Sequence, residues 1–229
     1  MPSWKFDAGP RCVSSVNFDN TNFYVGADTG LWVADIDSEN IFAWDLLFGL
    51  ECTSVWSNNT YLYYGTNASG IYRIEVATIS GELNGIRYKY EPEITSNTIK
   101  YIHGYSDKYL FIATTSGLDF IWIDLNTLAS KNKQNVFKTW VCSNGSIYYA
   151  VSGTKDRLYH NSTPNLDTYT TVYVCTSGDF SDVPNINDFY VTERTSSDGI
   201  HNTLFIAASG GAFVFDEGTK EIDQYVIGE

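Results

Sequence analysis

Few residues in this chain have the type and spacing that acid–base catalysis requires. Hydrolysis of a glycosidic bond needs two carboxylates roughly 5 to 10 Å apart, one acting as acid and the other as base or nucleophile. In or beside the short apolar segments that could carry such a pair, the available carboxylates are Glu51, Asp188 and Glu193. Because these segments are otherwise nearly free of carboxylates, a glycoside hydrolase is the least favoured of the functions considered below.

Metal binding and nucleophilic catalysis also lack their usual residue patterns. The three histidines, His103, His160 and His201, are far apart and have no partner at metal-ligand spacing. No pair of cysteines is close enough for a CxxC site, and neither a GxSxG nor a GxxxxGK[ST] motif occurs. We therefore expect no catalytic residue, no bound metal and no cofactor, and we expect free thiols at Cys12, Cys52, Cys142 and Cys175.

The composition favours β-strands and argues against polyanionic partners. Aromatic residues make up 16% of the 229 residues and charged residues 18%, whereas about 25% of an ordinary domain is charged. The net charge of −13 repels phosphate backbones and anionic headgroups, so we expect neither nucleic acid nor a membrane surface as partner. The start of the chain lacks the apolar core of a signal peptide, and its most apolar window, 41–50, is too short to span a bilayer.

One unit recurs five times along the chain. Each copy has an aromatic or β-branched run that ends in a small residue, then a Gly-containing turn, then a second aromatic run that ends near an acid. The small residue serves as an anchor for alignment, and we expect it to lie where neighbouring units press together. The mean spacing of about 45 residues is that of propeller blades. The anchors are Gly26, Gly65, Ala113, Ala150 and Ala207.

Each copy extends into a predicted four-stranded antiparallel unit. First strands are expected at 12–17, 52–57, 98–103, 139–142 and 186–192. Fourth strands are expected at 40–44, at 85–90, at 135–138 or slightly earlier, at 170–175 and at 221–227. The resulting blade limits are 12–50, 51–94, 95–138, 139–180 and 181–229, with 1–11 either an N-terminal arm or a strand that closes the ring.

The repeat resembles β-propeller blades. It is similar to the short blade of two-component-regulator propellers, with its hydrophobic-GT-x-x-G-hydrophobic-x-x-Asp pattern, best matched from Tyr64 to Glu75 and from Phe111 to Asp124. The resemblance implies an all-β fold, a five-bladed β-propeller with about four antiparallel strands per blade. It implies no single function, because propellers carry unrelated activities.

We expect a non-enzymatic structural or adhesion module of a larger assembly, with other protein subunits as partners. The apolar residues Trp44, Leu46, Leu47 and Phe48 are the candidate interface, since they cluster at the periphery of a blade. The polar surface composition resembles that of phage virion proteins of tails or capsids, which would act in host attachment. The protein is expected in the virion if phage-encoded and otherwise in the cytoplasm. The alternatives are a lectin-like propeller that binds glycans and, third, the glycoside hydrolase.

Overall fold

In the computed structural model, the regular secondary structure of the described residues is almost entirely β-strand. The structure describes residues 13–36, 44–79, 88–89, 94–105, 108–123, 127–131, 135–143, 145–152, 157–161, 170–174, 186–196, 199–208, 211–216 and 222–225. In this part of the chain the one helical element is a single 3-10 turn, Val76–Thr78. No helix of the described residues is long and apolar enough to cross a membrane. The expected arm at 1–11 lies outside the described residues.

The described strands form five antiparallel sheets of four strands, each paired in chain order. The first sheet contains β1 (Val13–Phe18), β2 (Asn22–Ala27), β3 (Gly30–Asp35) and β4 (Asp45–Phe48). The second contains β5 (Cys52–Ser57), β6 (Tyr61–Thr66), β7 (Ile71–Glu75) and β8 (Tyr88–Lys89). The third contains β9 (Ile99–Tyr105), β10 (Tyr109–Thr114), β11 (Leu118–Trp122) and β12 (Thr127–Lys131).

The remaining two sheets have the same order. The fourth contains β13 (Val136–Val141), β14 (Ile147–Val151), β15 (Arg157–Asn161) and β16 (Thr170–Val174). The fifth contains β17 (Ile186–Ser196), β18 (Gly199–Ala208), β19 (Gly211–Asp216) and β20 (Ile222–Tyr225). The expected all-β fold of five four-stranded blades is thereby confirmed.

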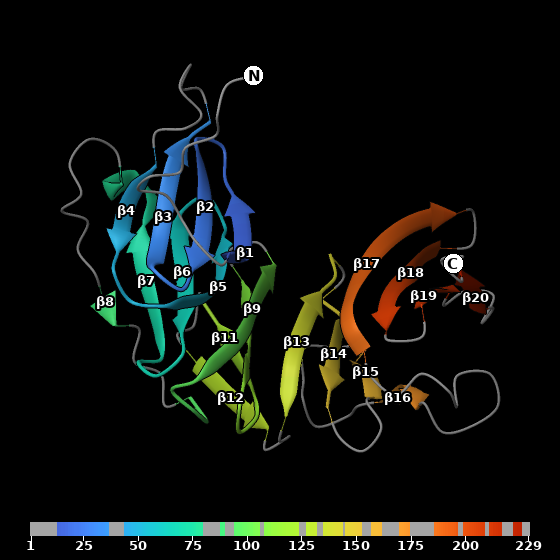
Figure 1. Cartoon of the computed structure of the whole chain (residues 1–229). Coiled ribbons are helices and arrows are strands. Elements are labelled where there is room, and N and C mark those ends of the chain that lie inside the picture. Colours follow the sequence, from blue (N-terminus) through green and yellow to red (C-terminus); the bar gives the residue numbers. More distant parts are fainter. Residues whose placement is uncertain are drawn as a thin grey trace.

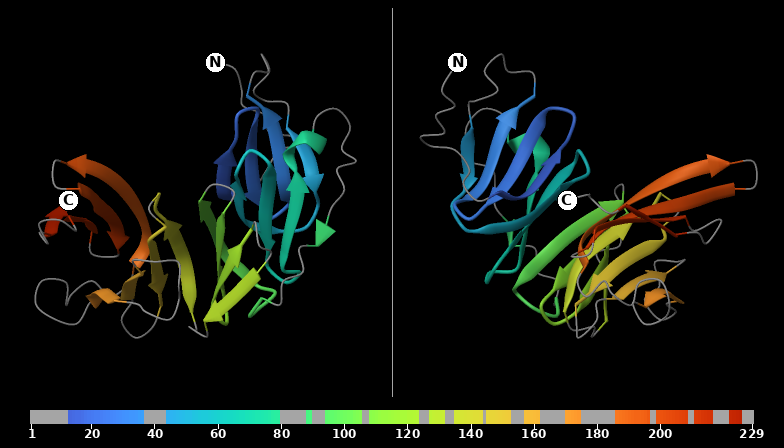
Figure 2. Two further views of the ribbon diagram at one scale, coloured as in Figure 1. Left: turned by 180° about the vertical axis from the view of Figure 1, so that it is seen from behind. Right: turned by 45° about the vertical axis from the view of Figure 1, so that its right-hand side comes forward.

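The blades follow one another along an open arc (Figures 1 and 2). The first strands of consecutive blades contact each other, from β1 to β5, β9, β13 and β17, and they form the inner side of the arc. Among the described residues, no strand of the first blade makes more than marginal contact with a strand of the fifth. All three views agree, because the first and fifth sheets stand apart in each of them.

The core lies between the blades rather than at one centre. Four clusters of buried apolar side chains join blade one to two, two to three, three to four and four to five. A fifth cluster, Val25, Ala27 and Trp32 with Trp44 packed on it, belongs to the first blade alone. Burial of apolar area between neighbouring sheets therefore holds the arc together.

Four of the five anchors lie where blades press together, as the sequence predicted, whereas Ala207 is exposed on the last blade. A Cβ added at Gly65 would stand 2.3 Å from Cγ2 of Ile99 in the third blade, and one at Gly26 would stand 2.9 Å from Sγ of Cys52 in the second. Since real Cβ atoms do not approach other atoms so closely, only a residue without a side chain fits there.

Two of the expected fourth strands lie elsewhere. The strand expected at 40–44 falls mostly outside the described residues, and the fourth strand of the first sheet is β4. The fourth strand of the third sheet is expected at 135–138 or slightly earlier. The bounds 135–138 are wrong, because 136–138 begins β13, which pairs with β14 along its whole length, and the earlier placement is the right one. The fourth strand of the third sheet is instead the more polar β12, and the fourth blade begins near 136 rather than 139.

Candidate functional site

The blades turn equivalent side chains toward the next blade. On β2, β6, β10, β14 and β18, an aromatic residue stands two positions before the anchor, on the same face of the strand. In the first four blades this aromatic side chain is fully buried in the cluster shared with the following blade: Tyr24, Tyr63, Phe111 and Tyr148. In the fifth blade it is Phe205, which is 40% exposed.

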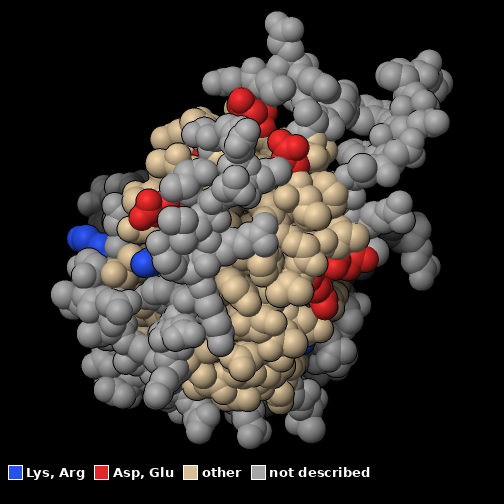
Figure 3. All heavy atoms as spheres, turned by 90° about the vertical axis from the view of Figure 1, so that its left-hand side faces the viewer, with Lys and Arg blue, Asp and Glu red and all other residues tan. Residues whose placement is uncertain are grey.

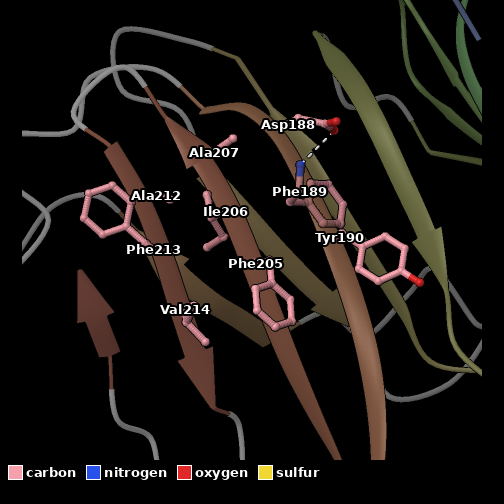
Figure 4. Close-up of a pocket in the computed structure, with 9 residues that line it drawn as sticks. All are labelled: Asp188, Phe189, Tyr190, Phe205, Ile206, Ala207, Ala212, Phe213 and Val214. Atoms are coloured by element: carbon pink, nitrogen blue, oxygen red, sulfur yellow. Dashed lines mark hydrogen bonds between the residues drawn. The ribbon is translucent and has the colours of Figure 1, made fainter. Parts of the chain in front are cut away.

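Phe205 belongs to an uncovered surface that we name the last end face. Cross-strand pairing places Tyr190 and Val214 on either side of Phe205, and Ala207 between Asp188 and Ala212. Figure 4 shows these side chains along β17, β18 and β19. The face is therefore a row of apolar side chains bordered by one carboxylate.

A shallow hollow of about 430 Å³ lies on the last end face, lined in part by Phe205, Ala207 and Ala212. Its cause is a change of side-chain size at one repeated position. The residue paired with the anchor on the third strand is large in blades one to four and small in blade five. These residues are Leu31, Ile71, Leu118 and Leu158 in the first four blades, and Ala212 in the fifth.

The opposite end of the arc carries a second surface with exposed apolar side chains, the first end face, beside the buried residues Val25, Ala27 and Trp32. Phe23 is 42% exposed, although the equivalent residues of blades two to five, Leu62, Leu110, Ile147 and Leu204, are fully buried. Its cross-strand neighbour Phe18 is 66% exposed, and Val16 is 59% exposed. Val13 and Leu46 share this face by register. Among the described residues, every exposed large apolar side chain except Leu50 lies on one of the two end faces.

The predicted interface residues are divided between two environments. Leu47 and Phe48 are buried against the second blade, where the Phe48 ring lies 5.0 Å from the ring of Tyr64. Leu46 is exposed on the first end face, and Trp44 is half-buried beside it on the Trp32 cluster. The interface at these four residues stays a prediction, with Trp44 and Leu46 accessible for it.

Polar side chains on the first strands bind the backbone of the next blade. The Ser15 hydroxyl accepts a hydrogen bond from Val55 N at 3.1 Å, and the Ser54 hydroxyl accepts one from Ile102 N at 2.9 Å. Both serines pair with the anchor of their own blade. The equivalent residues of the later blades are Tyr101, Lys138 and Asp188.

These later residues form an ionic and aromatic contact between blades three, four and five. Lys138 forms an ion pair with Asp188, and its Nζ lies 4.9 Å from the centre of the Tyr101 ring. Burial and, second, the Asp188 carboxylate raise the pKa of Tyr101 to about 12. The phenol is therefore neutral at pH 7.

His103 serves packing in this arrangement. Its Nδ1 accepts a hydrogen bond from Val141 N at 3.1 Å, and its ring stacks on Trp140 with 4.3 Å between centroids. Loss of solvation and, second, the Lys138 charge lower the pKa of His103 to about 3. The imidazole is therefore neutral, with Nδ1 occupied by the backbone of the next blade.

The structure does not bring Asp188 and Glu193 together as a catalytic pair. Asp188 and Glu193 are five residues apart on β17, which is about 16 Å along a strand and beyond the separation used by glycosidases. Glu193 accepts hydrogen bonds from Ser143 N and Oγ, and Glu51 accepts one from Asn67 Nδ2 at 3.2 Å. Each carboxylate thus has a structural partner.

On the side shown in Figure 3, the described acidic side chains lie in several separate places and not in one patch. No group of three or more potential metal ligands occurs among the described residues. Cys52 and Cys142 are buried free thiols, and burial raises the pKa of Cys52 to about 12.

Similar solved structures share this succession of blades. An extracellular domain of a proposed hybrid two-component system from B. thetaiotaomicron matches 94% of the chain with a TM-score of 0.64 at 14% identity. The fold is that of a β-propeller. The WD40 propeller domain of Doa1 matches 93% at a TM-score of 0.59 and 15% identity, and Kluyveromyces lactis Hsv2 matches 93% at 0.57 and 9% identity.

This propeller is shorter than the structures it resembles. It spans 27 to 30% of the length of the B. thetaiotaomicron domains, 67% of the Doa1 domain and 72% of Hsv2. No protein-family model matches the sequence, and no curated protein matches it. At these identities the similarity establishes the fold.

Apart from Leu46, the exposed residues of the end faces were missed by sequence reasoning. Phe23 and Phe205 lie in runs of the same kind as their buried equivalents. One usable signal was present, the replacement of a large apolar residue by Ala212 in the last copy.

Proposed function

We propose that this chain is a non-enzymatic binding module, a propeller that serves as a protein–protein platform in a larger assembly. The observation that carries the proposal is the concentration of exposed apolar side chains on the two end faces. Exposed apolar patches of this kind mark interaction sites in soluble proteins. The structural roles of Asp188, Glu193 and His103 support a role without catalysis.

Photo-cross-linking in the cells that produce the protein tests the platform. A photoreactive p-benzoylphenylalanine replaces Phe18 on the first end face, and in a matched control it replaces Thr60, an exposed turn residue of the second blade. Irradiation should cross-link position 18, but not position 60, to one partner protein at a constant molar ratio of partner to chain. Equal, scattered labelling from both positions would contradict a platform on the end faces.

The finer proposal is that the assembly is a phage virion, with the chain in its tail or associated with its capsid. This proposal rests on surface composition alone, and it places the protein in the virion or, if it is not phage-encoded, in the cytoplasm. Quantitative mass spectrometry of purified particles tests it. A constant number of copies per particle supports it, and loss of the chain on gradient purification contradicts it.

A glycan-binding propeller is the competing proposal. A lectin of this type needs a similar polar and aromatic pocket in every blade, whereas the hollow described above lies on the fifth blade. Strong, saturable binding of the purified chain to a glycan array would favour the lectin over the platform.

A further inference from the structure

The last end face is a further copy of a surface that is covered four times within this chain. Tyr24, Tyr63, Phe111 and Tyr148 each lie under the next blade, and Phe205 holds the same position with no described blade above it. An inference about what covers Phe205 rests on the proposed function, because it names the kind of partner that the platform binds.

The hollow indicates what the covering surface carries. In the other blades the space beside the anchor is filled by a large side chain of the same blade, such as Leu158. Ala207 and Ala212 leave this space open. Close packing at native density then requires a bulky apolar side chain from the covering partner.

The first strand of the fifth blade indicates that the covering element is a β-sheet. Ser15 and Ser54 each accept a backbone N–H from the first strand of the following blade. Asp188 is an acceptor at the same position, and its described contacts with Lys138 Nζ and Phe189 N both use Oδ1. A strand laid beside β17 in the usual register would present a backbone N–H to this carboxylate.

The size of the gap favours additional blades over a second copy of the arc. The five blades of this chain cover 67% of the length of the Doa1 domain and 72% of the length of Hsv2. A ring of that size therefore has room for about two more blades of ordinary length. A second five-bladed arc would exceed this room.

We propose that the last end face binds a blade-like antiparallel β-sheet of a partner protein, which continues the propeller in trans and inserts a bulky apolar side chain above Ala207 and Ala212. The partner sheet packs on Phe205 as the fifth blade packs on Tyr148.

Photo-cross-linking from position 205 tests this proposal. Full-length chain carrying p-benzoylphenylalanine in place of Phe205 is irradiated alone and in extract of the producing cells, and the joined peptides are identified. The same reaction is run with Ala212→Leu, which fills the hollow, and with Ala68→Leu, which adds the same atoms at an exposed turn. We expect a cross-link from position 205 to a β-strand of another protein. The yield of this cross-link should fall about tenfold with Ala212→Leu and stay unchanged with Ala68→Leu.

The other outcomes overturn the proposal in distinct ways. If the chain is irradiated alone and position 205 is cross-linked to residues 13–27 of the same molecule, the ring closes on itself. A covalent dimer would mean that a second copy covers the face. A partner cross-linked from position 18 but not from position 205 would retain the platform and reject the inserted sheet. A cross-link from position 205 that Ala212→Leu leaves unchanged would have the same meaning. Absence of a specific partner at both positions would reject the platform as well.

Discussion

Phe205 and Tyr148 hold the same position in two successive blades, yet Tyr148 is fully buried and Phe205 is 40% exposed. Tyr148 lies under the fifth blade, where its hydroxyl accepts a hydrogen bond from Asn202 Nδ2 at 2.9 Å. Phe205 has no described blade above it. The difference arises from the order of the blades and not from the local sequence.

Truncating these two rings should therefore have unequal effects on the stability of the isolated chain. Tyr148→Ala should lower the free energy of unfolding by about 3 kcal/mol or more, because it opens a cavity between two blades. Phe205→Ala should lower it by less than about 1 kcal/mol, since a half-exposed ring loses little burial. Urea denaturation measures both, and Tyr148→Phe isolates the hydrogen bond. Equal losses for the two alanine variants would contradict the open end face.

Gly65 should not tolerate a side chain. Gly65→Ala places a methyl group against Ile99 of the next blade and should destabilise the protein by about 1 to 3 kcal/mol. Gly49→Ala is the matched control, because no atom lies within 4 Å of its added Cβ. Thermal unfolding of both variants distinguishes close blade packing from a general glycine effect. A Gly65→Ala variant as stable as Gly49→Ala would argue against that close approach.

Much of the fold could be predicted from the sequence because blades are local units. The small anchors at Gly26 and Gly65, each followed by a turn and a second aromatic run, indicated the sheets before any contact was known. The fourth strands were harder to place. The polar sequence of β12 gives little indication of a strand, and the apolar start of β13 resembles the fourth strand of the preceding blade. The exposure of Phe23 and Phe205 could not be predicted from their own segments, since it depends on whether another blade stands beside them.

The backbone contacts between blades should depend on single hydroxyl groups. Ser54→Ala leaves the buried N–H of Ile102 without its acceptor and should cost about 1 to 3 kcal/mol. Ser57→Ala should change stability by less than about 0.5 kcal/mol, because its hydroxyl accepts an exposed N–H from Asn59 at 3.3 Å. Hydrogen exchange of the Ile102 amide should accelerate only in the Ser54 variant. If the Ile102 amide exchanges equally slowly in the Ser54 variant, the Ser54 hydroxyl does not contribute to the contact between the blades.

Acid should destabilise the protein partly through His103. Its pKa is lowered to about 3 in the folded state, while the unfolded chain binds the proton near the ordinary value of about 6.5. The unfolded state therefore holds more protons between these values, and stability falls as the pH drops below about 6.5, by at most about 1.4 kcal/mol per pH unit. His103→Asn keeps an acceptor for Val141 N but does not titrate, so its urea midpoint should vary less between pH 7 and pH 4. Identical pH profiles for the two proteins would show that folding does not lower the pKa of His103.

Hydroxyl-radical footprinting of the purified chain tests the uncovered end faces most directly, because it measures side-chain accessibility in solution. Phe18, Phe23 and Phe205 should be oxidised rapidly, while Tyr24, Phe111 and Tyr148 stay protected. If Phe23 and Phe205 are as protected in the chain alone as Tyr148 is, the five blades close on themselves and the end faces are not free to bind a partner.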